Sequence, residues 1–408
     1  MRLAALLAVT LALAVPAFAD DATESPSLLE QIRPGGRVEQ WRGRLAERGV
    51  EPYLVYTGSM WSNVSGGIRT GTEFDGYLDT GFDIDLEKLG AWRGLGLQAS
   101  LHWFQGRKPT ELLVGASLAQ AVNPWEASNA IRVFNLYLSQ RFGDGGVVRV
   151  GQLAVDSDFM LSRYAATMLN AAFGDLPSQN VNLDVPVYPV AGPGIYAASG
   201  LGEALTGRLG VYTADTAPDT AGNHGFEWRL GNNAGYALLL ELTASGAPGG
   251  LPGAYTAGGC FASVRQPTWD GNGLVHAQWA GWLIVDQALR LDARGNPAVG
   301  VFARFSWSPD DGRSAITIYG DAGLNVFGPI RGRPEDVLGF AGSVGRYADA
   351  FRRGEQPPSG GAAALELTYQ IAATPWLVVQ PDLQYLIDPI AAGATDAIVI
   401  GLEMVLTF

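Results

Sequence analysis

The segment Phe74–Glu87, FDGYLDTGFDIDLE, constrains the fold more than any other part of the chain. Alternate residues from Phe74 to Leu86 carry no charge, whereas the interleaved residues from Asp75 to Glu87 are almost all acidic or polar. A period of two is typical of a β-strand, because successive side chains leave a pleated backbone on opposite faces. The segment is also far longer than the usual strand of ~5–6 residues. It fits either a large soluble β-sheet or the wall of a membrane barrel.

The first nineteen residues have the pattern of a secretory signal peptide. Met1-Arg2 precedes an apolar run from Leu3 to Val15, which ends in the Ala-x-Ala site of Ala17–Ala19. A membrane anchor is the alternative, but the run is shorter than the ~20 residues that a spanning helix needs. We therefore expect residues 1–19 to be removed, leaving an exported protein without a transmembrane helix.

Composition excludes several classes of function. The 40 acidic residues outnumber the 27 basic ones, which argues against nucleic acid as a partner. Cys260 is the only cysteine and the three histidines have no ligand spacing, so we expect neither metal nor cofactor. An outer-membrane hydrolase would need a nucleophile beside a base, and the sequence has no Gly-x-Ser-x-Gly motif. We therefore predict that the protein is not an enzyme.

Residues 20–50 differ from the rest of the chain because their apolar residues do not alternate. The spacing of Leu28, Leu29 and Ile32 and of Trp41 and Leu45 predicts short helices broken near residues 34–36. This N-terminal segment is expected to be periplasmic and helical; a cap, an oligomerisation arm, a plug or a solvated lead-in all remain open. From residue 51 to residue 408 the chain predicts one strand after another.

The clearest later strands separate polar from apolar residues. Ile131–Phe142 places Asn135, Tyr137 and Arg141 on one face, and its other face carries Phe134, Leu136, Leu138 and Phe142. Ala363–Ile371 and Trp376–Ile387 alternate in the same way, and Ala397–Phe408 has a continuous apolar face.

Two further features favour a membrane barrel over a soluble sheet. Breaks between strands alternate between short ones, such as residues 143–146, and long ones, such as residues 107–130, as in outer-membrane barrels. The last strand also ends on Phe408, which a barrel can place in its interfacial aromatic girdle. We therefore predict an all-β fold: an outer-membrane antiparallel β-barrel of about 16 strands, with residues 51–408 as the barrel domain.

A barrel of ~16–18 strands encloses a water-filled channel, so the polar faces of its strands line a lumen. The predicted pore-lining residues are Asp79, Asp83, Asn135, Tyr137, Arg141, Arg149, Glu366, Gln380 and Asp382. For each of them the alternative is a wall residue that a neighbouring side chain satisfies, without contact to a solute.

The long break Val155–Gly194 is rich in aromatic residues, with polar residues between them. A loop of this length is usually functional or disordered, and its apolar content argues against disorder. We predict that it folds into the pore and narrows it. The predicted constriction residues are Asp158, Phe159, Arg163, Tyr164 and Phe173. Alternatively, the loop packs on the inner wall and only sets the width of the pore.

Several motifs together resemble one family across nearly the full mature length. They are WRGRLAERGV, GYLDTGFDIDLEKLGAWRG, VRVGQLAVDSDFM with LNAAFGDLP and VYPVAGPG downstream, and WLVVQPDLQYLIDP followed by GLEMVLTF. In this order and spacing they resemble the OprB family of carbohydrate-selective porins, although Arg42 stands where that family usually has a glycine. The resemblance implies a sixteen-stranded outer-membrane barrel that passes sugars, glucose among them, through a constriction with charged residues and inward-folded loops.

The leading hypothesis is a passive carbohydrate channel whose selectivity comes from a narrow polar and aromatic lumen. A general porin, or one for small organic acids, is the alternative. The expected partners are small sugars, outer-membrane lipid and the barrel-assembly machinery, the last through the strand that ends at Phe408. A homotrimer is among the assemblies left open.

Overall fold

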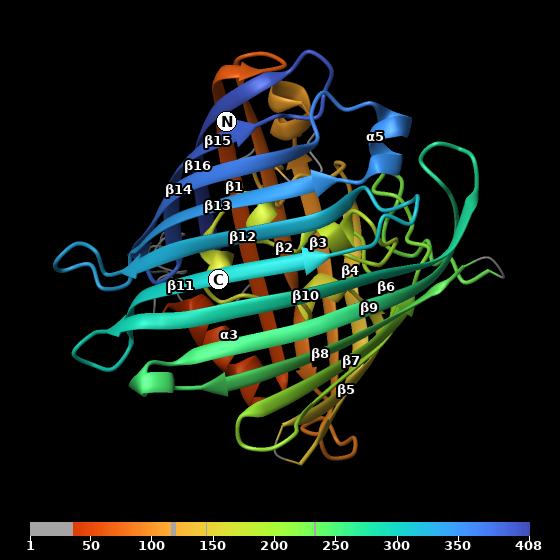
Figure 1. The fold of residues 1–408 in the computed structure, drawn as a ribbon. Helices are drawn as coiled ribbons and strands as arrows, with labels where there is room; N and C mark the ends of the chain where they lie inside the picture. Colours follow the sequence, from red (N-terminus) through yellow and green to blue (C-terminus); the bar gives the residue numbers. More distant parts are fainter. Residues whose placement is uncertain (1–35, 116–119, 144, 232–233) are drawn as a thin grey trace.

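The computed structural model describes residues 36–115, 120–143, 145–231 and 234–408. They form a closed barrel of sixteen strands in which each strand pairs with its neighbours in sequence and β1 pairs with β16 (Figure 1). The strands are β1 (Val50–Gly67), β2 (Gly71–Asp85), β3 (Leu95–Gly106), β4 (Ile131–Phe142), β5 (Gly146–Leu153), β6 (Gly192–Gly200), β7 (Leu205–Thr213), β8 (Tyr236–Gly246), β9 (Gly253–Pro267), β10 (Leu274–Leu291), β11 (Pro297–Trp307), β12 (Ile316–Phe327), β13 (Val337–Tyr347), β14 (Gly361–Thr374), β15 (Leu377–Ile387) and β16 (Thr395–Thr407).

Helices are few and short. They are α3 (Arg37–Glu47), α4 (Pro177–Asn180), α5 (Asp349–Glu355), η1 (Thr110–Val114), η2 (Val155–Ser157), η3 (Ala165–Thr167), η4 (Ala171–Phe173) and η5 (Pro248–Gly250). Among the described residues, no helix has the length and apolar character that a membrane crossing requires.

The wall follows the alternation in the sequence. In β2 the outward-facing Phe74 and Phe82 expose 41% and 47% of their surface, whereas Asp75 and Tyr77 point inward and expose 4% and 6%. Leu367 in β14 is likewise exposed on the outside. Hydrocarbon offers no hydrogen bonds, so a sheet that crosses it has to close on itself. The predicted barrel, its strand number and these two strand faces are confirmed.

Phe408 pairs with β1 at the end of the seam where the first and last strands meet. The Leu54 and Phe408 backbones exchange two hydrogen bonds, with N···O distances of 2.9 and 3.2 Å. The pairing continues from Val55 opposite Thr407 to Gly67 opposite Thr395. Phe408 therefore completes the ladder.

The connections differ in length between the two ends of the barrel. The four longest, residues 107–130, 154–191, 214–235 and 348–360, all lie at one end, and those at the other end have nine residues or fewer. Outer-membrane barrels have short periplasmic turns and long outer loops, which orients the chain.

Phe134 corrects one prediction about strand faces. It was expected to point outward with Leu136 and Leu138, but its ring centroid lies 4.1 Å from that of His102 inside the barrel. The cause is a register shift between the pairs Ala99–Leu136 and Leu101–Val133, a bulge that changes which face a residue takes.

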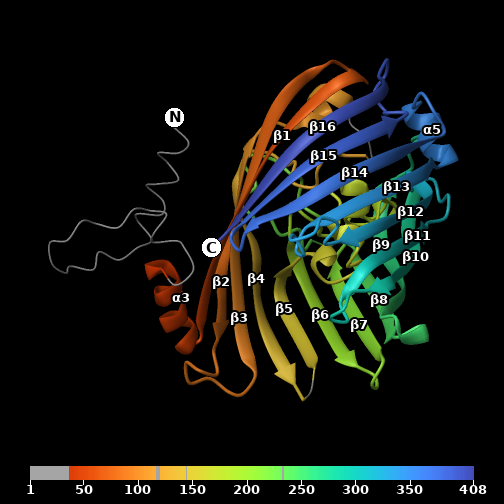
Figure 2. The same cartoon turned by 90° about the vertical axis from the view of Figure 1, so that its left-hand side faces the viewer.

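The helix α3 lies beside the outer side of the barrel near β1 and β2, and not within the lumen (Figure 2). Lys88 Nζ donates to the Ala46 carbonyl at 3.1 Å and so ties its last turn to the β2–β3 connection. The predicted signal peptide and the first part of the predicted N-terminal segment lie outside the described residues.

Candidate functional site: the constriction loop

Residues 154–191, which join β5 to β6, run through the interior of the barrel (Figure 1). We call them the constriction loop. Four short helical turns, η2, η3, η4 and α4, are all of its regular structure. Most of its other backbone groups need partners from elsewhere, because a buried polar group without one is costly. Inward-facing side chains of the wall provide many of them.

Three carboxylates of the wall accept hydrogen bonds from backbone N–H groups of the loop. Glu241 in β8 accepts from Met160 at 2.9 Å. Asp286 in β10 accepts from the backbones of Arg163 and Tyr164 at 3.1 and 3.3 Å and from the Ser162 hydroxyl at 2.7 Å. Glu366 in β14 accepts from Leu169 and Asn170 at 2.6 and 2.8 Å.

Other wall residues donate to carbonyl oxygens of the loop. Asn325 in β12 donates to Tyr164 at 2.8 Å, and Gln380 in β15 donates to Thr167 at 2.9 Å. Arg304 in β11 donates to Ala172 at 2.9 Å and also to Gly174. The loop is therefore fastened at six strands around the wall, which fixes its position in the lumen.

Arg304 is itself held by a buried carboxylate. Its Nε and Nη2 lie 2.9 and 2.7 Å from the two oxygens of Asp321 in β12, and both side chains are almost completely buried. A fork-to-fork pair of this kind fixes direction as well as distance. The guanidinium therefore reaches two loop carbonyls at once.

Only one side of the loop faces the open lumen. Leu161 exposes 56% of its surface and Arg163 and Ala166 are also exposed, whereas Ser162 and Tyr164 between them are buried against the wall. Short-range alternation thus gives the loop a wall side and a channel side. Arg163 forms no ion pair with any described residue.

Arg149 in β5 is held by a carboxylate of the loop and by two aromatic rings. Its Nη1 lies 2.7 and 2.9 Å from the two oxygens of Asp158 in the loop. Its guanidinium also packs 5.3 Å from the ring centroid of Tyr137 and 5.2 Å from that of Tyr196. Burial raises the pKa of Asp158, and the adjacent Arg149 acts in the opposite direction. In this cluster of four residues the charges of Arg149 and Asp158 balance each other.

A second ion pair of an arginine and a carboxylate lies on the neighbouring strands β7 and β8. Arg208 in β7 donates to Glu241 at 3.0 Å and to Thr243 at 2.7 Å. Glu241 also accepts from the Trp282 indole at 2.9 Å. One carboxylate therefore anchors the loop and neutralises an arginine.

Four other predicted pore-lining residues lie away from these two ion pairs. Asp79 is part-exposed, accepts from the Tyr53 hydroxyl at 3.2 Å and lies 3.4 Å from His102 Nε2. Asp83 and Arg141 are exposed near the ends of their strands, on the periplasmic side of the loop. Asn135 lies at the β4 bulge, where its backbone N–H donates to Ser100 at 2.9 Å. Among the described residues, no hydrogen bond or ion pair joins these four to the constriction loop.

Several predicted residues serve the packing of the loop. Phe159 and Phe173 expose 1% of their surface and Tyr164 exposes 3%, all against the wall. Glu366 and Gln380 bind the loop backbone, and Asp382 accepts from Gln384 at 2.9 Å. Their burial favours a role in setting the width of the pore over stacking against a solute.

A second inward segment adjoins the constriction loop, whose Tyr188 hydroxyl donates to the Trp125 carbonyl at 3.2 Å. In residues 120–130, Trp125 stacks on Tyr77 at 5.2 Å and donates to Glu403 at 2.9 Å. Glu126 accepts from the Thr110 backbone at 3.1 Å, and burial raises the pKa of this carboxyl to about 8.

Most anchors were missed from the sequence. The anchors Glu241, Asp286, Arg304 and Asn325 each lie at an inward position of a strand, as does Arg208, the partner of Glu241. A lone charge in an apolar run, as in YALLLELT or LIVDQA, is the signal that could have found two of them. It marks an inward face but does not identify the partner.

Comparison with known proteins agrees with this architecture. Residues 70–408 match the family model described as carbohydrate-selective porin, OprB family. Porin B of Pseudomonas aeruginosa is 24% identical over 420 residues, covering 90% of each chain. The putative porin QuiX of Acinetobacter baylyi is 22% identical, covering 90% of this chain and 92% of its own.

Solved structures agree with the fold. The high-pH structure of Pseudomonas putida OprB superposes with a TM-score of 0.82 at 20% identity, covering 91% of this chain and 97% of that one. The low-pH structure of the same protein gives 0.59 over the same share of each chain, at 17% identity.

Proposed function

The chain belongs to the OprB family of carbohydrate-selective porins, and from that premise we propose that its constriction favours small neutral sugars, glucose among them. The protein is a passive carbohydrate channel of the bacterial outer membrane. Which solutes pass, and how strongly they are distinguished, depends on the lining of the lumen.

The observation that carries this proposal is the pairing of charges at the constriction. Arg149 is neutralised by Asp158, and Arg208 by Glu241. A paired guanidinium still has N–H groups that can donate to hydroxyls, because each fork carries five donors. Such a lining can replace part of the hydration of a sugar without concentrating ions, and binding stays weak enough for release.

The test is liposome swelling with a panel of sugars. Arg149→Gln removes the fork and leaves Asp158 unpaired, so glucose entry should fall relative to the wild-type channel. Arg294→Gln is the matched control, because Arg294 is exposed in the β10–β11 turn, outside the lumen. Equal glucose rates in the two variants would remove Arg149 from the sugar path.

A channel for small organic acids is the second candidate, because Arg163 is an exposed cation on the channel side of the loop. The two candidates separate in one comparison, the permeation of glucose against gluconate, an anion of similar size. A sugar channel passes glucose faster. Faster gluconate entry, lost in Arg163→Gln, would support the organic-acid channel.

We also propose how the barrel is inserted into the membrane and how its chains associate. We expect the barrel-assembly machinery to bind β16 through its end at Phe408, and the barrel to be able to form a homotrimer. Deleting Phe408 should slow folding into the membrane, and crosslinking in native membranes measures the number of chains in the assembly.

A further inference from the structure

The barrel wall is shortest at the strands β5, β6 and β7. They have 8, 9 and 9 residues, against 18 in β1 and β10. At ~3.3 Å per residue and a tilt of ~40°, strands of this length span roughly 20–23 Å, less than the ~25 Å apolar band of such barrels. The wall needs an additional element here.

The same place exposes an edge of β4. Pairing between β4 and β5 ends at Leu136 opposite Gln152, while β4 continues beside β3 as far as Ile131. Residues 131–135 therefore have no β5 backbone partner on their other side, where the Gln152 side chain alone reaches from β5, donating to the Val133 and Phe134 carbonyls at 2.7 and 2.8 Å. Unpaired backbone groups cost several kcal/mol each when they face hydrocarbon.

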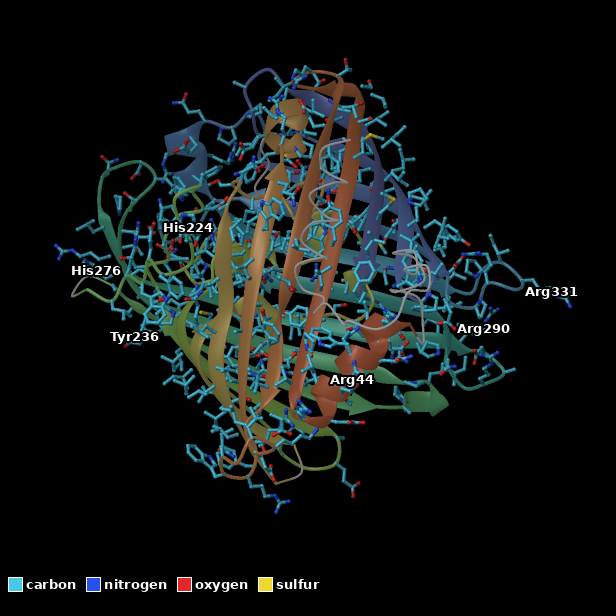
Figure 3. The ribbon with its side chains drawn as sticks, turned by 180° about the vertical axis from the view of Figure 1, so that it is seen from behind. Arg44, His224, Tyr236, His276, Arg290 and Arg331 are labelled. Atoms are coloured by element: carbon cyan, nitrogen blue, oxygen red, sulfur yellow. The ribbon has the colours of Figure 1, made fainter. Side chains whose placement is uncertain are left out.

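Residues 223–230, part of the β7–β8 connection, cover that edge; we call them the outer strap. The Val133 N–H donates to the His224 carbonyl at 3.0 Å, and His224 Nδ1 lies 2.8 Å from the Ile131 carbonyl oxygen. The Trp228 indole donates to Gln152 Oε1 at 2.7 Å. Figure 3 labels His224 and Tyr236 on the same side of the barrel.

The strap touches β4 closely enough to require a glycine. Gly225 has φ +97°, and a Cβ there would lie 2.0 Å from the Val133 carbonyl oxygen. The segment before it is fixed from inside the barrel by Arg132, which is fully buried. This guanidinium donates to the Asn223 and Thr220 carbonyls at 2.9 and 3.2 Å and to Asp219 at 3.0 Å.

Apolar and charged side chains alternate along the exposed strap: Glu227 and Arg229 lie between the apolar residues, and Arg229 pairs with Asp215 at 3.0 Å. Phe226, Trp228 and Leu230 expose 59%, 46% and 63% of their surface. They continue the exposed outer belt, and Trp228 closes a groove of about 390 Å³ whose other apolar walls are Val150, Ile195, Val211 and Tyr236. An exposed apolar patch of this kind marks an interaction surface.

We infer that the outer strap is a membrane-embedded part of the barrel wall, with Phe226, Trp228 and Leu230 packed against acyl chains of outer-membrane lipid. The strap is continuous with the lipid-facing belt and covers an edge that hydrocarbon does not tolerate. The occupant of the groove beside Trp228 is therefore an acyl chain. This inference is independent of which solute passes through the channel.

The test is the accessibility of spin labels in liposomes. Single cysteines replace Phe226, Trp228 and Leu230 in a Cys260→Ala background, and collision with oxygen is compared with collision with a water-soluble nickel chelate. Leu240→Cys in β8 is the lipid-facing control, and Arg294→Cys is the control in water. We expect oxygen-to-nickel ratios that match Leu240→Cys and exceed Arg294→Cys several-fold.

Each other outcome overturns the inference. Ready access of the nickel chelate would place the strap in water. Exclusion of both reagents would show that protein, such as a second copy of this chain, covers it. The three positions are labelled separately, so one variant that fails to fold does not prevent the test.

The native chain provides a second measurement. Lipids brominated on their acyl chains quench tryptophans that they touch. Trp228→Phe keeps the apolar surface, and it should lose part of the quenching seen in the wild-type protein. Unchanged quenching in Trp228→Phe would contradict the inference.

Discussion

Asp286→Ala tests whether wall side chains set the width of the pore. The Asp286 carboxylate accepts three hydrogen bonds from Ser162, Arg163 and Tyr164. These residues adjoin the part of the constriction loop that faces the channel. Alanine removes both acceptor oxygens, and with them all three hydrogen bonds, and leaves the strand in place, so the loop loses this attachment to β10.

The free energy by which Asp286→Ala destabilises the attached loop can be worked out from the donors that lose their partner. Each donor left without an acceptor costs about 1–3 kcal/mol when it is buried. Water of the lumen can reach part of the site, so about 1 kcal/mol for each, or about 3 kcal/mol in total, is the appropriate end of that range. The population of displaced loop should then rise about a hundredfold, because 1.4 kcal/mol is a factor of ten.

Liposome swelling with glucose and with the trisaccharide raffinose measures the result. We expect Asp286→Ala to raise the raffinose-to-glucose ratio and the single-channel conductance. Asp286→Asn keeps one acceptor oxygen and should stay close to the wild-type protein. A folded Asp286→Ala barrel with the wild-type ratio and conductance would show that the anchor does not control the width.

Three further perturbations test other parts of the structure. Asp321→Ala leaves Arg304 buried without its carboxylate and should lower the free energy of unfolding by about 3–5 kcal/mol in urea titrations, whereas replacing both residues with apolar ones should recover most of that loss. Gly225→Ala forces a Cβ to 2.0 Å from a β4 carbonyl oxygen and should speed proteolysis of the β7–β8 connection, whereas Gly222→Ala, with nothing within 4 Å, should not. Burial raises the pKa of Glu126 from 4.5 to about 8, so the contribution of its extra bound proton to folding stability is complete below pH 4.5 and is lost as the pH rises through 8. Glu126→Gln should therefore flatten the fall in thermal stability between those pH values, and an unchanged slope would contradict the assignment.

The site shows where prediction from the sequence stops. Arg149, Tyr137 and Asp158 were each predicted as pore residues, because strand phase and loop length identify them one at a time. Their contact was not predictable, since Asp158 reaches Arg149 only after the loop turns back into the barrel. Phe134 was misplaced because the bulge in β4 depends on the register of β3, which no pattern within β4 reveals.

The sequence by itself determined the wall: alternation with a period of two is a local property, and it predicts which residues face lipid and which face the lumen wherever no bulge interrupts the register. Only the tertiary structure decided where the long connections go. Glu366 binds Asn170 across 196 positions, and residues 223–230 cross to an edge of β4 about ninety positions earlier. Contacts of this kind depend on closure of the barrel, which brings together residues that have no local relation in the chain.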